Sequence, residues 1–191
     1  DLRTIDTVTA TANAALPKVG GTLTGNLATA GISAVTAGTS NFVAGVNAGN
    51  SITSGGNYNT VVGDEAGTAI TTGDNNVAVG YTALDANTTA SNNTAVGRYA
   101  LTANTTGSKN TSVGSGSLAA NTTGAINVAV GYQAMLSNTT ASYNTAVGNE
   151  SLKANTTGTQ NTAMGSSALI DNTTGGYNTG LGYIALFENT T

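Results

Sequence analysis

A 17-residue alternation of polar and apolar positions organises most of the chain. From Asn41 onward an asparagine recurs every 17 residues, after one opening step of 18, and an Asn-Thr-Thr triplet recurs with the same period from Asn87. We number the positions of one repeat as columns 1 to 17, with the first asparagine in column 1. A fixed period of this length predicts stacked supersecondary units in place of one globular core.

Two columns carry the large apolar side chains. Column 4 is Val, Met or Leu in every copy but the first, and column 9 is Leu or Met in every copy but the first two, which have Gly49 and Gly67. Columns 3 and 8 are small, and column 5 is always Gly. We predict that the two large columns form the core. The predicted core residues are Val79, Leu84, Val96, Leu101, Val113, Leu118, Val130, Met135, Val147, Leu152, Met164, Leu169, Leu181 and Leu186.

A helix does not fit these columns, because their spacings of 5 and 12 residues match no helical stripe and the glycines would interrupt it. The alternation in Thr94-Ala95-Val96 predicts a short strand, with Thr94 and Val96 on one face and Ala95 on the other. Gly97 can then turn the chain with a positive φ. We predict a second short strand through columns 8 and 9 and a return corner at Asn-Thr-Thr-Gly. Each repeat is then one coil of an all-β, parallel β-solenoid, a flat two-sheet roll of nine 17-residue coils over residues 41–191.

Two segments precede this array. Residues 1–16 carry apolar side chains at a helical spacing, which predicts a helical or extended stalk with a coiled-coil role that ends before Pro17. Residues 17–40 form a connector, with a short alternating strand at 22–24 between glycines. The chain begins at Asp1 without a Met and stops fourteen positions into a repeat, so we expect a fragment of a longer protein.

Composition narrows the function classes. Only 7% of the 191 residues are charged and the net charge is −4, whereas nucleic-acid binding requires clustered Lys and Arg. The chain has no His and no Cys, which removes Ser-His-Asp and Cys-His catalysis and the usual zinc sites. No apolar run reaches the roughly 20 residues that span a membrane. We expect a non-enzymatic protein with no cofactor, no metal, no nucleic-acid partner and no membrane insertion.

Columns 6 and 7, beside the glycine turn, vary most and form the candidate binding surface. A scaffold that keeps its frame and varies its turns can present such a surface, and Tyr and Arg are frequent interface anchors. The alternative is that these are exposed turns of a spacer. The candidate surface-binding residues are Tyr81, Arg98, Tyr99, Tyr132, Gln133 and Tyr183.

Other residues allow other interpretations. Asp64, Glu65 and Asp74 form the one dense acidic group, for which a calcium site is the alternative to a solvated corner. The remaining carboxylates occupy different coils and mostly different columns, which disfavours a glycosidase pair. The Asn-Thr-Thr triplets match the N-glycosylation pattern, but their strict period favours structural corners with stacked asparagines. An ice-binding solenoid is a further alternative, although adjacent corner threonines such as Thr105 and Thr106 make a poor flat array.

One Val and one Leu per coil make a thin core. Their burial offsets only part of the entropy that is lost when 17 residues are ordered, and stacked backbone hydrogen bonds recover a further part. We predict that neighbouring chains supply the rest, with the small side chains of columns 3 and 8 allowing close approach.

The repeat Asn-Thr-Ala-Val-Gly-x-x-Ala-Leu followed by Asn-Thr-Thr-Gly resembles repeats of bacteriophage tail fibres, as does the segment 16–27. It is similar, more distantly, to the head repeats of trimeric autotransporter adhesins. The resemblance implies a homotrimeric, parallel fibre in the virion, a rigid shaft that contributes to host-surface attachment. Implied partners are further copies of the chain, other tail or fibre proteins, and a host glycan or protein. The alternative is the head region of a bacterial trimeric adhesin at the cell surface.

Overall fold

The computed structural model describes residues 32–33 and 37–190. The expected stalk of residues 1–16 and the predicted strand at 22–24 lie outside the described residues. The described chain is all-β and contains no helix. Its strands are β1 (Ile32–Ser33), β2 (Phe42–Ala44), β3 (Thr60–Val62), β4 (Val77–Val79), β5 (Thr94–Val96), β6 (Thr111–Val113), β7 (Val128–Val130), β8 (Thr145–Val147), β9 (Thr162–Met164) and β10 (Thr179–Leu181).

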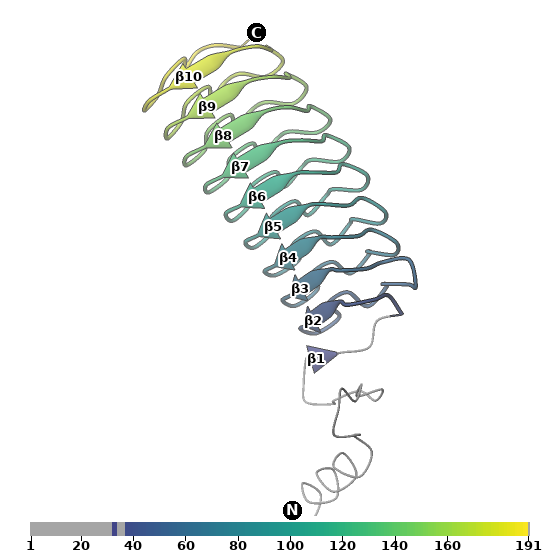
Figure 1. Ribbon diagram of the computed structural model, residues 1–191. Helices are drawn as coiled ribbons and strands as arrows, with labels where there is room; N and C mark the ends of the chain where they lie inside the picture. The colour runs from purple at the N-terminus through teal and green to yellow at the C-terminus, as the bar shows by residue number, and fades with distance from the viewer. Residues whose placement is uncertain (1–31, 34–36, 191) are drawn as a thin grey trace, which may run out of the picture.

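The strands form one sheet in chain order, and the coils stack along its length (Figure 1). β2 to β10 are parallel and pair column on column, so that Thr94 lies beside Thr111 and Val96 beside Val113. This register confirms the predicted parallel β-solenoid, with nine strands joined by eight turns of the chain. β1 pairs antiparallel with β2 and occupies the edge at the N-terminal end of the ladder.

Each coil contains one strand, so the second sheet expected at columns 8 and 9 is not formed. Leu101, in column 9, has a φ of 53°, which an extended strand cannot contain. Two turns replace the strand: the N–H of Ala100 donates to the carbonyl of Gly97, and the N–H of Asn104 donates to that of Leu101, both over 3.2 Å. The left-handed conformation recurs at column 9 in every coil and turns the Leu side chain inward, where its burial offsets the backbone strain.

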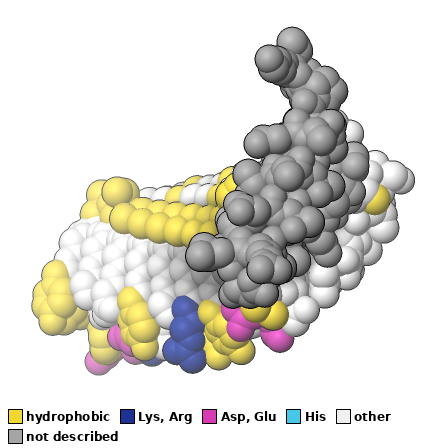
Figure 2. All heavy atoms as spheres, turned by 90° about the horizontal axis from the view of Figure 1, so that it is seen from below, with side chains coloured by type: hydrophobic (Ala, Val, Ile, Leu, Met, Phe, Trp, Pro, Cys, Tyr) yellow, Lys and Arg dark blue, Asp and Glu magenta, His cyan; other side chains and the backbone are white. Residues whose placement is uncertain are grey.

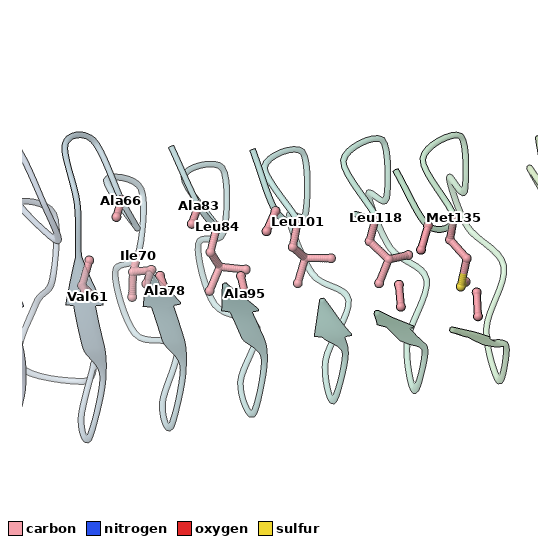
Figure 3. Close-up of a cluster of buried hydrophobic side chains, with 14 of the residues drawn as sticks. Val61, Ala66, Ile70, Ala78, Ala83, Leu84, Ala95, Leu101, Leu118 and Met135 are labelled. Carbon is pink, nitrogen blue, oxygen red and sulfur yellow. The ribbon is translucent and has the colours of Figure 1, made fainter. Parts of the chain in front are cut away.

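The interior is filled from columns 3, 8 and 9, and Figure 3 shows the side chains of Leu84, Leu101 and Leu118 pointing from the turns toward the strands. Column 9 is buried as predicted in Leu84, Leu101, Leu118, Met135, Leu152 and Leu169, whereas Leu186 in the last coil is 49% exposed. The prediction for column 4 is wrong. Its members point outward and are half-buried or exposed: Val79, Val96, Val113, Val130, Val147, Met164 and Leu181.

The choice between the two faces of the strand depends on volume. Ala95 faces inward with no exposed surface and lies opposite the leucine row, so a small residue fits there. The small columns 3 and 8 therefore line the coil's own interior and do not allow the approach of neighbouring chains that we expected. The valines of column 4 are left on the outside of the strand ladder.

The first two coils fill the same interior with other residues. Gly67 takes the place of Leu in column 9, and Ile70 takes the place of Asn in column 12. A Cβ built on Gly67 would lie 2.8 Å from Cδ1 of Ile70 and 3.2 Å from Cγ1 of Val61. Ile70 and Val61 thus occupy the volume that one leucine fills in the later coils (Figure 3).

Two ladders of buried asparagine close the coils. Asn93 in column 1 and Asn104 in column 12 both donate from Nδ2 to the carbonyl oxygen of Gly107, each over 2.9 Å. Asn104 Nδ2 also donates to Oδ1 of Asn87 in the preceding coil, and Asn93 Oδ1 accepts from the backbone N–H of Asn110 in the next. The predicted stacked asparagines are confirmed, and buried side chains bonded in this way are structural.

Candidate functional site

The turn after each strand forms a ridge along the solenoid, which we call the turn ridge and define as columns 5 to 7. Its glycine has φ near that of Gly97, 135°, and each turn is tied to the preceding coil. In the coil that follows β5, the N–H of Gly97 donates to the carbonyl of Val79 at 2.8 Å, and that of Tyr99 to the carbonyl of Tyr81 at 3.0 Å. The variable side chains therefore stand on a fixed backbone, at one coil spacing from one another.

Three of the predicted surface residues lie together on this ridge. The rings of Tyr81 and Tyr99 meet edge to face, with centroids 5.6 Å apart and planes at 67°. The guanidinium carbon of Arg98 lies 4.3 Å from the centroid of the Tyr99 ring, and its Nη2 donates to the Tyr99 hydroxyl at 3.1 Å. Cation–π and edge-to-face contacts of this kind hold exposed side chains in one arrangement.

The other predicted residues are farther along the ridge. Tyr132, 52% exposed, and Gln133 belong to the turn after β7, while Tyr183, 76% exposed, belongs to the last coil and does not join either group. Between the two groups, columns 6 and 7 hold Ser115 and Gly116, the smallest pair on this part of the ridge.

The acidic group does not form a metal site. Within the described residues, no cluster of three or more acidic side chains could hold a metal ion. Asp64 and Glu65 are exposed on the turn ridge, whereas Asp74 lies just before the next strand, where its Oδ1 accepts from the backbone N–H of Asn57 at 2.7 Å. Partial burial raises the pKa of Asp85, a carboxyl that also accepts a hydrogen bond from Thr102.

The outer face of the strand ladder is a second surface, which we call the strand face and define as columns 2 and 4 of β2 to β10. None of its residues is charged, and one apolar residue of column 4 lies in each coil. Figure 2 shows a row of hydrophobic side chains along the solenoid, while charged side chains gather along another edge. The exposed members with the largest side chains are Phe42 at 55%, Val128 at 37%, Met164 at 46% and Leu181 at 64%.

Sequence reasoning missed a further variable column. Column 17 comes immediately before the strand-side asparagine, and it exposes Tyr58, Ile126, Tyr143 and Tyr177 beside the strand face. Its variation from coil to coil was as visible in the sequence as that of columns 6 and 7. Of the charged residues, column 17 carries only Lys109, so it extends the weakly charged side of the solenoid.

No model of a known protein family matches this chain, and neither a curated protein nor a solved structure matches it. Within the described part of the chain, no helix has the length and apolarity to cross a membrane. The functional argument therefore depends on the two surfaces.

Proposed function

We propose that this chain is a structural, non-enzymatic segment of a bacteriophage tail fibre, in which three parallel copies associate through their strand faces into a rigid shaft of the virion. The observation that carries the proposal is the uncharged, apolar strand face that runs along all nine parallel strands. A continuous apolar surface of this kind marks an interaction site.

The periodicity of the strand face favours a second copy as its partner. Column 4 places one apolar side chain on each strand, and strands are spaced about 4.8 Å apart. Only a surface with the same spacing can match this row along its full length, and further copies of the chain provide one. Parallel copies in register place equivalent coils at equal heights, which is the arrangement of a cyclic oligomer.

The coil interior supports association as well. Ala95 and Leu101 supply most of the apolar volume of one coil, so the burial available within a single chain is small. Association that covers Val96 and its equivalents adds apolar burial at every coil. A shaft then gains length by repetition and resists unfolding through contacts among three chains.

The alternatives use the same scaffold. The head of a bacterial surface adhesin would have the same shaft, and sequence flanking the array distinguishes the two. Ice binding would use the exposed row of column 14, which includes Thr106 and Thr123. The neighbouring row does not add a second rank of free hydroxyls, because Thr105 Oγ1 donates to the carbonyl of Thr122 at 3.1 Å. The corner thus favours a structural role.

The test is the mass of the folded particle. Size-exclusion chromatography with light scattering should give the mass of three chains, and the double variant Val113→Asp, Val130→Asp should dissociate, because it places charges in the interface. The matched control is Thr123→Asp, Thr140→Asp, which adds the same charges to the exposed column 14 of the same two coils. A folded wild-type monomer would sink the proposal, and equal dissociation of the control would remove the strand face as its site.

A further inference from the structure

The turn ridge has a gap between its two groups of large side chains, which we call the ridge gap. Ser115 and Gly116 form its floor, and a Cβ added to Gly116 would meet nothing nearer than Cγ of Gln133 at 3.5 Å and Cδ1 of Leu136 at 3.7 Å. The coils that carry Tyr99 and Tyr132 are two strand spacings apart, about 9.6 Å. One flat ring in van der Waals contact with both sides requires about 7–8 Å, so the ridge gap admits a single ring.

One wall of the ridge gap carries an oriented positive charge. The Arg98 guanidinium rests on the Tyr99 ring and donates to its hydroxyl, and Tyr81 packs against the edge of the same ring system. Among the described residues the one ion pair joins Lys153 and Glu150, so no carboxylate neutralises Arg98. A guanidinium held in this way binds a carboxylate with less loss of side-chain entropy than a free one.

The opposite wall offers a ring and polar groups. Tyr132 is half exposed, and Gln133 and Ser115 bring an amide and a hydroxyl to the same place. The backbone is already used: the N–H of Gly116 donates to Arg98 at 2.9 Å, and that of Gln133 to Ser115 at 3.0 Å. A peptide therefore finds no free strand edge here, and recognition depends on the side chains.

From this juxtaposition of Arg98, Tyr132 and the small floor residues, we propose that the ridge gap binds an acidic saccharide, a sugar ring that carries a carboxylate. The ring stacks on Tyr132, its hydroxyls bond to Ser115 and Gln133, and its carboxylate pairs with Arg98. This inference goes beyond the proposed shaft and does not depend on association, because the turn ridge lies off the strand face and is present in a single chain.

The test is a calorimetric titration with an oligogalacturonate, with the matching neutral galacto-oligosaccharide and with an oligoglutamate peptide. We expect the oligogalacturonate to bind at millimolar concentration and the other two to bind at least tenfold more weakly, about the contribution of one charge-assisted hydrogen bond. Arg98→Gln should reduce affinity for the acidic sugar about tenfold and leave the neutral sugar unaffected.

A gap-filling variant completes the design. Ser115→Tyr places in column 6 the residue that Tyr81 and Tyr132 already have there, so the fold accepts it, and it should abolish binding. Ser166→Tyr makes the same change in the same column away from the gap and should bind like the wild type. The proposal is overturned if the wild type does not bind, if Arg98→Gln has no effect, if the peptide binds as tightly, or if both tyrosine variants lose binding alike. Light scattering on each variant shows the association state separately, so a failure of the shaft proposal is distinguishable from a failure of this one.

Discussion

Replacing the interior residues of the second coil with those of the later coils tests whether packing volume decides which face of the strand is buried. The second coil combines Val61, Gly67 and Ile70, and the later coils combine Ala, Leu and Asn at the same columns. The backbone is equivalent, since φ is 55° at Gly67 and 56° at Leu84. Side-chain volume is therefore what the exchange changes.

The structure gives the expected magnitudes. Gly67→Leu alone forces a Cβ to within 2.8 Å of Ile70 and overfills the coil, at a cost of about 1–3 kcal/mol. Ile70→Asn alone removes a fully buried apolar side chain and should cost about 2–5 kcal/mol. Val61→Ala alone should cost about 2 kcal/mol by the same mechanism. In the triple variant, however, the leucine fills the space of Ile70 and Val61, and the new asparagine extends the ladder that begins at Asn87.

We expect the triple variant to unfold within about 1 kcal/mol of the wild type, far from the sum of the single changes. Urea unfolding followed by circular dichroism measures all four free energies, with the association state checked at each protein concentration. Ile70→Val serves as the control for a small cavity. If the triple variant is destabilised by the sum of its parts, the volume argument is refuted and some other property of the first coils retains Gly67.

Four further outcomes follow from single residues. Asn121→Ala breaks the ladder, leaving its buried neighbours with unmet hydrogen bonds, and should cost about 2–4 kcal/mol in urea unfolding. Gly97→Ala should prevent folding, as judged by circular dichroism, because φ is +135° and the new Cβ would lie 2.6 Å from the backbone of the next coil. Ser151→Ala should raise the unfolding free energy by about 1 kcal/mol, since its Oγ is buried without a partner, and a loss of stability would contradict this. Desolvation raises the pKa of Asp85 in the folded state, so the folded protein binds this proton more tightly than the unfolded chain. Its contribution to stability is thus unfavourable at neutral pH and improves as pH falls through the raised pKa toward 3.8, and thermal unfolding of Asp85→Asn should show no such gain.

The candidate site was partly visible in the sequence. Tyr81, Arg98 and Tyr99 occupy variable columns in adjacent coils, and the 17-residue period brings such columns together. The contact of Arg98 with the Tyr99 ring was not predictable, because it depends on the rotamers of two exposed side chains. The gap at Gly116 likewise becomes meaningful only when neighbouring coils are in place.

The period by itself determined the solenoid, the position of each strand and the glycine turn, because backbone pairing between identical units requires only that they repeat. Tertiary structure alone decided which side of the strand is inside. Val96 is more apolar than Ala95, yet Ala95 is buried, since the inward leucine at column 9 leaves room only for a methyl group. Hydrophobicity along a three-residue strand cannot reveal that, because the volume opposite each side chain is set by a residue six positions away.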